Sequence, residues 1–559
     1  MKKLMTLVMA LAVSMTMLIA QETSDPLLRT TKQGQVKGYQ DADYGVYVWK
    51  GIPYASSPTG ELRFRAPQDA PSYEGVLDAT KPGNVAIQLS GKDVIGSEDC
   101  LNLDIYRPAT EEANLPIIVY IHGGNNQTGH SGEISGLTLA GQADCVYVSL
   151  NYRLGALGFN CLSALNTGNK EEDSGNYALL DIAKALDWVK DNAVAFGGNG
   201  KNITVTGFSA GGRDVMAMLI SPIFKGKFQK AISYSGGMTV SEVEPSRKVF
   251  ARAIAPLVVE DKVKSSLDEA YEWLLTSDSS VRDYLYAIDA SRLASIMGNA
   301  GIRMSVFPHL YADGYVIPKT GFDGNPKYNN VPLIMLTGTT EFSMFNMGGG
   351  VYAPFMANGT LFTDPEHIKE FNWGSKYGSK LYELFNAEES AQRMSKYKGK
   401  IYTVSVNAGN DGELASKMGV FGAFHGIFVP LIDASNKNYT GIVGDVFESD
   451  GLKELSSIYL SYIKNFIRTG NPNAKGLPEW TVWTSKADKN NTLFMDADLS
   501  KADVRMVNRR IVYSDVLKQM DEDDSINAEI KKGIITTSLN GRWFSGLLDS
   551  YYGNKNLWD

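Results

Sequence analysis

The most constraining feature of this sequence is a glycine-flanked serine between a strand-like run and a helix-like run. The run NITVTG (202–207) is rich in β-branched residues, and AGGRDVMAMLI (210–220) begins with small residues and continues as a helix. Between them Ser209 lies in GFSAGG, where glycines two residues before and two after it allow a sharp turn. Such a turn exposes the serine hydroxyl to the amides at the N-terminus of the following helix. The pattern predicts a nucleophilic serine on a strand-to-helix turn.

Continuous apolar runs predict strands that are buried on both faces of a sheet. They lie at 115–121, 145–150, 228–235 and 332–337. Segment 97–108 alternates as an ordinary strand should, and 177–192 and 452–470 place their apolar residues at helical intervals. Strands that alternate with helices in this way predict an α/β fold whose mostly parallel central sheet is flanked by helices.

The chain contains no linker-like tract of Pro, Ser or Gly, so we expect residues 21–559 to form one domain. Segments 240–330 and 350–400 are charged and helix-like, without further buried strands. We expect them to form a helical cap over the site. The last fifty residues give mixed signals and no prediction.

The N-terminus has the pattern of a secretory signal peptide. Lys2 and Lys3 precede an apolar run at 4–20, and polar residues follow Ala20. A membrane anchor is the alternative, because the run is close to the shortest length that spans a bilayer. No basic stop-transfer segment follows the run, so we expect residues 1–20 to be removed. The predicted product is exported, to the periplasm or the extracellular space, and has no stable membrane anchor.

Charge and composition exclude several classes of partner. The formal net charge is −8 and no basic block occurs, which argues against nucleic acid. No cluster of His, Cys and Asp suggests a metal, and no organic cofactor is expected. The three cysteines leave at least one thiol free, and Cys145 lies in an apolar strand-like run. The fold is therefore not expected to depend on disulfides.

A serine becomes a nucleophile when a histidine takes its proton and an acid orients that histidine. The five histidines are His122 and His130 in the loop after 115–121, His309 in a Phe-Pro-His stretch, His367 in a charged helix-like segment, and His425 in FGAFHGIFVP. In α/β-hydrolases the chain order is Ser, acid, His. Only His425 follows every candidate acid, whereas His122 is expected to support its loop.

Two acids between residues 209 and 425 are candidates for this role. Glu341 follows the buried run LIMLTGTT and so lies on the loop just past a strand. Asp313 is the runner-up, although its Asp-Gly pair is typical of a turn. Backbone donors for the oxyanion are expected from HGG (122–124), because glycine amides can approach a substrate carbonyl, together with the amide of Ala210.

Motifs along most of the chain resemble the type-B carboxylesterases, a family that includes cholinesterases and bacterial para-nitrobenzyl esterases. The matching blocks, from residue 50 to about 483, include GIPYA, LRFRAP, SEDCLNLDIY, YIHGGNN, NYRLGALGF, GFSAGG, GTTEFSMF, AFHGIFVP and FIRTGNPN. The resemblance implies an α/β-hydrolase. It also implies a nucleophile Ser209, an acid Glu341, a base His425 and oxyanion amides of Gly124, Asn125 and Ala210.

The resemblance also implies two structural ion pairs, Arg63 with Glu98 and Arg153 with Asp181. The chain departs from the family pattern at particular positions. Asn125 stands where a third glycine is usual, Phe208 replaces the glutamate before the nucleophile, Phe342 follows the acid in a segment two residues shorter than usual, and Ala86 stands where the partner of Cys100 is expected. The disulfide of Cys100 is therefore predicted to be absent.

These observations predict a secreted serine esterase that acts on small carboxylic esters through an acyl-enzyme. Two alternatives remain at this point. The first is a non-catalytic recognition domain of cholinesterase type, because Asn125 and Phe208 alter the surroundings of the serine. The second is an amide or carbamate hydrolase that uses the same three residues.

Overall fold

The computed structural model describes residues 25–296, 306–324, 326–347 and 351–554. Within these residues the central sheet has eleven strands in the order β16-β15-β14-β13-β12-β11-β9-β10-β8-β4-β3. Every neighbouring pair from β15 to β10 is parallel, and both edges of the sheet are antiparallel. The prediction of a mostly parallel α/β sheet is confirmed.

The strands of this sheet, in chain order, are β3 (Tyr39–Asp41), β4 (Val46–Pro53), β8 (Asn102–Pro108), β9 (Leu115–Ile121), β10 (Val146–Leu150), β11 (Gly198–Phe208), β12 (Lys230–Tyr234), β13 (Leu333–Gly338), β14 (Ile401–Val406), β15 (Thr492–Ala497) and β16 (Ala502–Val507). Smaller sheets contain β1 (Leu28–Thr30), β2 (Gln35–Lys37) and β5 (Val76–Asp78), and β6 (Gln88–Ser90) with β7 (Asp93–Ile95). The four apolar runs form β9, β10, β12 and β13 as predicted. The strand predicted in segment 97–108 is present as β8. All its residues are buried, because Leu103 and Ile105 belong to the core on one face of the sheet and Tyr106 to the core on the other.

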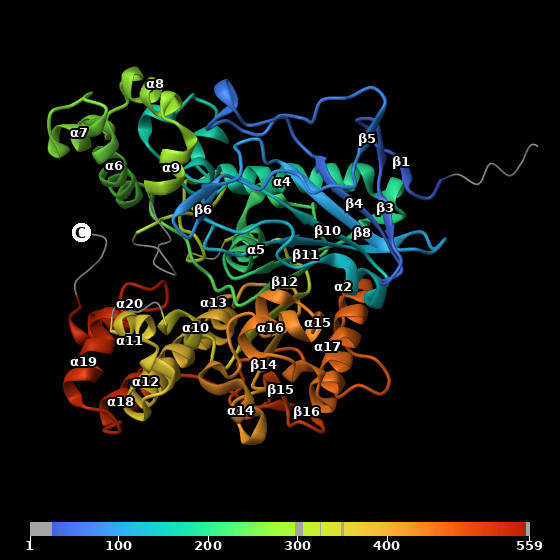
Figure 1. Cartoon of the computed structure of the whole chain (residues 1–559), viewed down its shortest axis with the longest axis vertical. Helices are drawn as coiled ribbons and strands as arrows, with labels where there is room; N and C mark the ends of the chain where they lie inside the picture. Colours follow the sequence, from blue (N-terminus) through green and yellow to red (C-terminus); the bar gives the residue numbers. More distant parts are fainter. Residues whose placement is uncertain (1–24, 297–305, 325, 348–350, 555–559) are drawn as a thin grey trace, which may run out of the picture.

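Helices cover both faces of the sheet (Figure 1). On one face α4 (Tyr177–Asn192) and α5 (Ala210–Ile220) share a core with alternate residues of β9, and on the other α2 (Gly136–Ala143) and α17 (Asp450–Thr469) do the same. Helix α4 begins and ends at the predicted residues. Helix α17 begins two residues before the predicted start. Its last residue is Thr469, and the helix is capped by Gly470, whose φ of +75° favours glycine.

The two predicted excursions are helical. The first contains α6 (Val243–Glu260), α7 (Leu267–Leu274), α8 (Ser279–Ala287) and α9 (Ala290–Ile296); the second contains α11 (Ala353–Ala357), α12 (Pro365–Glu383) and α13 (Glu389–Arg393). The last fifty residues, which gave no prediction, form α18 (Tyr513–Glu522), α19 (Ala528–Thr537) and α20 (Gly546–Tyr552), and they share a hydrophobic cluster with α12.

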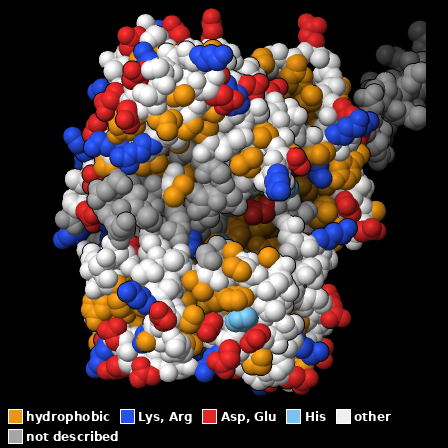
Figure 2. Space-filling view, turned by 60° about the vertical axis from the view of Figure 1, so that its left-hand side comes forward, with side chains coloured by type: hydrophobic (Ala, Val, Ile, Leu, Met, Phe, Trp, Pro, Cys, Tyr) orange, Lys and Arg blue, Asp and Glu red, His pale blue; other side chains and the backbone are white. Residues whose placement is uncertain are grey.

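These helices gather at one end of the molecule, with α6–α9 above and α11 and α18–α20 below in Figure 1. Figure 2 turns this end forward and shows a hollow between the two groups, with hydrophobic side chains on its visible wall. The prediction that both excursions are helical is confirmed, and their helices lie at one end of the molecule.

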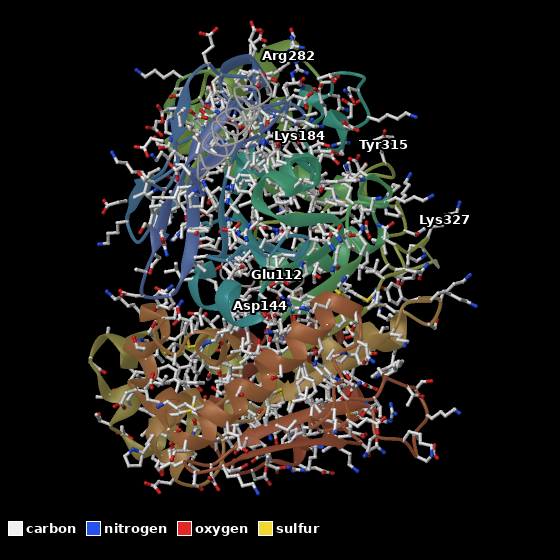
Figure 3. All side chains as sticks on the ribbon, turned by 90° about the vertical axis from the view of Figure 1, so that its right-hand side faces the viewer. Glu112, Asp144, Lys184, Arg282, Tyr315 and Lys327 are labelled. Carbon is white, nitrogen blue, oxygen red and sulfur yellow. The ribbon has the colours of Figure 1, made fainter. Side chains whose placement is uncertain are left out.

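Seen from the side in Figure 3, the N-terminal layer meets the helices of the C-terminal part at Asp144, which caps α2. The Asp144 carboxylate pairs with Lys464 of α17, and Arg468 donates to the Ala143 carbonyl oxygen at 2.8 Å. These contacts join α2 to α17, which cover the same face of the sheet.

The predicted signal peptide lies outside the described residues. Among the helices that are described, none has the length and the apolar character needed to cross a bilayer.

Candidate active site

The predicted turn at Ser209 is present between β11 and α5. Ser209 has a φ of +56° and a ψ of −113°, an unfavourable conformation for an L-residue. A Cβ on Gly207 would lie 2.1 Å from the Gly211 carbonyl oxygen, and a Cβ on Gly211 would lie 2.1 Å from the Ile121 carbonyl oxygen. Both positions therefore require glycine. The backbone segments approach each other closely at these glycines, and this approach makes the turn tight.

Glu341 and His425 meet beside this turn, at the end of the sheet where the parallel strands finish. The His425 Nδ1–H donates to Glu341 Oε2 at 2.6 Å. Glu341 Oε1 accepts from Ser235 Oγ at 2.6 Å, from Thr337 Oγ1 at 3.0 Å and from the Gly338 amide at 2.5 Å. The carboxylate is buried, so these neutral donors and the imidazole fix its orientation.

The runner-up acid has a different role. Asp313 accepts hydrogen bonds from the amides of Tyr315, Val316 and Ile317 at 2.8–2.9 Å, as expected for an Asp-Gly turn. The structure brings Glu341, and not Asp313, to His425.

Aromatic rings surround the His425 imidazole. The ring centroids of Phe208 and Phe345 are both 4.6 Å from that of His425, and that of Tyr382 is 5.8 Å away. Between described side chains there is no hydrogen bond from Ser209 Oγ to the imidazole; such bonds often tighten only when substrate is bound. Phe208, which replaces the usual polar residue, thus gives the imidazole an apolar face.

The loop after β9, residues 122–126, packs against the serine. A Cβ on Gly123 would lie only 3.2 Å from the Ser209 Cβ. The Gly123 amide donates to Glu133 Oε2 at 3.1 Å, whereas the amides of Gly124 and Asn125 have no acceptor among the described residues. The amide of Ala210 is the first of helix α5 and lacks an intrahelical partner. The three amides predicted to bind the oxyanion therefore have no hydrogen-bond acceptor among the described residues.

Side chains from the helix after Ser209 hold this loop in place. Arg213 Nη2 donates to Asn125 Oδ1 at 2.9 Å, and Asn126 Nδ2 donates to Asp214 Oδ1 at 2.9 Å. Both α5 residues are buried; burial lowers the pKa of Arg213 to about 10 and raises that of Asp214 to about 7. The sequence analysis missed this pair, although two adjacent charges in the otherwise apolar run 210–220 were a signal.

The Arg213 guanidinium also contacts two distant parts of the chain. Its Nη1 donates to His309 Nε2 at 3.1 Å, and His309 donates from Nδ1 to the Phe307 carbonyl oxygen at 2.9 Å. The Trp543 ring lies beside the guanidinium, with 3.8 Å between its centroid and Cζ. The C-terminal segment therefore reaches the site.

The other histidines have structural roles in this conformation. His122 is buried and stacks on Tyr152 at 4.4 Å, and its Nδ1–H donates to the Gly123 carbonyl oxygen at 3.0 Å. Burial lowers its pKa to about 3, so it is neutral. As predicted, His122 supports its own loop. His130 is exposed. His367, in α12, stacks on Phe355 of α11.

Comparisons with known proteins agree with this geometry. A family model described as "Carboxylesterase family" matches residues 25–352. The chain belongs to the carboxylesterase family. It is 41% identical over 276 residues to the para-nitrobenzyl esterase of Bacillus subtilis, an alignment that covers 47% of this chain and 53% of that protein. It is 30% identical over 530 residues to carboxylesterase 1D of Rattus norvegicus, covering 83% of this chain and 89% of the relative.

A solved structure of a PNB esterase has a TM-score of 0.67 to this chain and 28% sequence identity, and the match covers 89% of this chain and all of that one. The family and its relatives identify this carboxylesterase as a serine hydrolase of carboxylic esters. The α/β-hydrolase fold predicted from the sequence is confirmed.

The ion pairs implied by the resemblance are present in this carboxylesterase. Arg63 Nη2 lies 2.6 Å from Glu98 Oε2, and Arg153 Nη2 lies 2.6 Å from Asp181 Oδ1. The three cysteines are Cys100, Cys145 and Cys161; all are buried and free, and burial raises their pKa values. The absence of a disulfide at Cys100 is confirmed. Among the described residues, no group of three or more His, Cys, Asp or Glu side chains could hold a metal ion.

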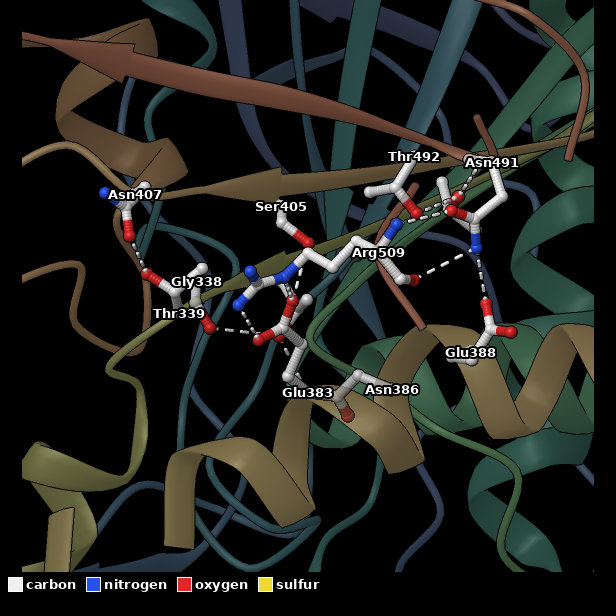
Figure 4. A network of polar contacts seen from close by, with 12 residues as sticks. Gly338, Thr339, Glu383, Asn386, Glu388, Ser405, Asn407, Asn491, Thr492 and Arg509 are labelled. Atoms are coloured by element: carbon white, nitrogen blue, oxygen red, sulfur yellow. Dashed lines mark hydrogen bonds and ion pairs between the residues drawn. The ribbon is translucent and has the colours of Figure 1, made fainter. Parts of the chain in front are cut away.

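A second polar network lies behind the acid loop of this carboxylesterase (Figure 4). Glu383, at the end of α12, accepts from Ser405 Oγ and from Arg509 Nη2, both at 2.8 Å. The chain then passes through a π-helical turn (Leu384–Glu388), from which Asn386 Nδ2 donates to Thr337 Oγ1 at 3.3 Å. Because Thr337 also donates to Glu341, this network supports the acid from behind.

Proposed function

We propose that this carboxylesterase hydrolyses its ester substrates through an acyl-enzyme on Ser209, with His425 as the base and Glu341 as the acid. The observation that carries the proposal is the 2.6 Å hydrogen bond between His425 Nδ1 and Glu341 Oε2 beside the strained turn of Ser209. This bond leaves His425 Nε2 as the basic nitrogen of the imidazole.

In the proposed mechanism His425 Nε2 takes the hydroxyl proton as Ser209 Oγ attacks the ester carbonyl carbon. The oxyanion of the tetrahedral intermediate accepts hydrogen bonds from the amides of Gly124, Asn125 and Ala210. His425 then gives the proton to the leaving alcohol, and the ester C–O bond breaks. A water molecule, deprotonated by the same nitrogen, attacks the carbonyl carbon of the acyl-enzyme. The bond from that carbon to Ser209 Oγ then breaks, His425 returns the proton to Oγ, and the carboxylic acid leaves.

The buried Glu341 carboxylate stabilises the imidazolium that forms in both steps. Ser235, Thr337 and Gly338 all donate to its Oε1 and so fix the orientation of the carboxylate. Its Oε2 therefore points toward the imidazole. The aromatic rings of Phe208 and Phe345 limit the rotation of that imidazole. Two features therefore hold the base before substrate arrives.

We also infer that the chain is exported, because Lys2, Lys3 and the apolar run at 4–20 have the pattern of a signal peptide. Mass spectrometry of protein secreted by an expressing cell tests this inference. A mature N-terminus close to Gln21 is expected, whereas a chain that keeps its first twenty residues would contradict it.

The experiment that tests the reaction is hydrolysis of p-nitrophenyl esters from acetate to octanoate, with Ser209→Ala measured beside the unchanged protein. We expect the variant to lose at least about 10⁴-fold in kcat and to keep its fold by circular dichroism. A fluorophosphonate probe should label the unchanged protein on the peptide that contains Ser209. Substantial hydrolysis by the variant would mean that another residue is the nucleophile.

The same series separates the alternatives. A p-nitroanilide and a carbamate in parallel assays measure amide and carbamate hydrolysis, and we expect the ester to have the highest kcat/KM. Turnover of none of the substrates would favour a recognition domain, in which the surroundings of Asn125 and Phe208 have disabled the serine.

A further inference from the structure

The loop that carries the proposed oxyanion amides has an unusual backbone in this enzyme. Asn125 and Asn126 are consecutive, and both have a φ of +57°. Left-handed backbone disfavours L-residues, and asparagine tolerates it better than most. Glycine would adopt this conformation without help from a side chain.

The two asparagine side chains are held by two consecutive residues of helix α5. Arg213 Nη2 donates to Asn125 Oδ1, and Asp214 Oδ1 accepts from Asn126 Nδ2, each at 2.9 Å. Asn125, Asn126, Arg213 and Asp214 are all at most 7% exposed. Since α5 begins directly after Ser209, these bonds fix the loop to the same rigid helix that positions the nucleophile.

The guanidinium is itself fixed in place by groups around it. His309 accepts from its Nη1 at 3.1 Å, and the Trp543 ring packs beside it. A planar guanidinium with its donors in a rigid fork can place one nitrogen against Asn125 with little freedom. The Asn125 side chain is held at both ends, because its Nδ2 donates to Gln127 Oε1 at 3.0 Å while its Oδ1 accepts from Arg213. Of these two partners only the arginine belongs to helix α5, so it fixes the direction of the side chain, and with it the orientation of the peptide, relative to Ser209.

We propose that Arg213 is a positioning residue for the oxyanion amides and acts through the side chain of Asn125. The neighbouring pair Asp214–Asn126 does the same for the next peptide. The inference rests on the proposed function, in which the Asn125 amide donates to the oxyanion. It assigns the arginine no contact with substrate.

The first test is Arg213→Met, which keeps a long side chain and removes its donors. A donor of the oxyanion site contributes about 10²- to 10³-fold to kcat, and a displaced donor retains part of this effect. We expect kcat for p-nitrophenyl butyrate to fall about 10- to 100-fold while KM changes less than about threefold. The affinity for a trifluoromethyl ketone, which forms a tetrahedral adduct on the serine, should fall by the same factor as kcat.

The decisive test is rescue by Asn125→Gly. Glycine holds a φ of +57° without an anchor, so we expect the Asn125→Gly enzyme to keep kcat within about threefold of the unchanged protein. Adding Arg213→Met to it should then cost less than about threefold. Losses that multiply in the double variant would show that the arginine acts on something other than Asn125, and would overturn the proposal.

Arg107→Met is the matched control, because Arg107 is also buried and donates only to backbone carbonyl oxygens at the far end of β8. It should lower the melting temperature and leave kcat unchanged. If Arg213→Met fails to fold, Arg213→Lys, which lacks the planar fork, replaces it in the same cycle. An Arg213 variant that retains full kcat while Ser209→Ala is inactive would overturn the inference alone. An active Ser209→Ala would overturn the proposed function instead.

Discussion

The two sides of Ser209 are held by different means. On one side, Glu341 is oriented by two hydroxyl groups and a backbone amide at the ends of β12 and β13. On the other, the loop of Asn125 is held by charged side chains that reach across from α5. The first arrangement has neutral donors around one charge, and the second has two buried charges around neutral amides.

The difference teaches where a carboxylesterase can change without losing its geometry. The proposed acid Glu341 follows β13, which pairs in continuous register with β12 and β14, so small neutral donors suffice to orient it. The proposed oxyanion loop, residues 122–126, belongs to no strand or helix. Its position therefore depends on the side chains that hydrogen-bond to it. Under the proposal, asparagine can occupy position 125, where the backbone favours glycine, because Arg213 holds its side chain. Arg213 can do so because it lies one helical turn after Ser209.

The largest effect is expected on the acid side. Glu341→Gln keeps the shape but removes the charge that stabilises the imidazolium, and we expect kcat to fall about 10³- to 10⁴-fold. Glu98→Gln is the control, because this carboxylate pairs with Arg63 and contacts neither His425 nor the network behind Glu341. Steady-state kinetics on a p-nitrophenyl ester measures both. A larger loss in Asp313→Asn than in Glu341→Gln would refute the choice of acid.

A smaller effect is expected when one neutral donor is removed. Ser235→Ala deletes the 2.6 Å hydrogen bond to Glu341 Oε1, while Thr337 and Gly338 still donate. We expect a loss in kcat of about 3- to 10-fold. Ser233→Ala removes another buried hydroxyl, on β12 two residues before Ser235. This hydroxyl donates to the Gly236 carbonyl oxygen and not to Glu341, so its loss should leave kcat unchanged. Equal losses in the two variants would show that the acid does not depend on this donor.

The oxyanion side should respond to the loss of Trp543 to a similar extent. A desolvated cation–π contact contributes about 2 kcal/mol, of which only the part that orients Arg213 reaches the reaction. Trp543→Leu should therefore lower kcat about 3- to 10-fold in the Asn125 enzyme and have no effect after Asn125→Gly. Trp273→Leu, in the remote cation–π contact with Lys264, is the control. Persistence of the Trp543 effect in the glycine variant would assign this ring another role.

The last prediction concerns stability and its dependence on pH, and involves no change in kcat. His122 has a folded-state pKa of about 3 because it is buried, against an ordinary value of 6.5. Between these values the unfolded chain binds a proton that the folded chain excludes, so stability is lost as pH falls below 6.5. From pH 7 to pH 4 this loss is about 3 kcal/mol at 1.36 kcal/mol per pKa unit.

Urea unfolding of His122→Phe tests this prediction. The variant cannot take up that proton, so the difference in free energy of unfolding between it and the unchanged protein should narrow as pH falls to 4. His130→Phe alters an exposed histidine of the same loop and serves as the control. A difference that stays constant with pH would mean that His122 does not resist protonation.

The parts of this molecule that could be predicted from the sequence are those with local patterns. Four apolar runs predicted β9, β10, β12 and β13, and the periodicity of α4 predicted both of its ends. The alternating segment 97–108 predicted β8 but not the burial of its polar residues, which depends on the layers that cover both faces of the sheet. The contacts of Arg213 with Asn125, His309 and Trp543 join segments about 90 to 330 residues apart, and no local pattern contains such information.

The position of Trp543 beside Arg213 has a consequence for synthesis. The ring that completes the surroundings of the guanidinium is translated roughly 330 residues after the nucleophile, which takes roughly 20 to 60 s at ribosomal rates of about 5–20 residues per second. During that interval Ser209 and its loop can already be folded, while the arginine lacks one of its supports. A hydrolase assembled in this order can reach full activity only after Trp543 has been added to the chain.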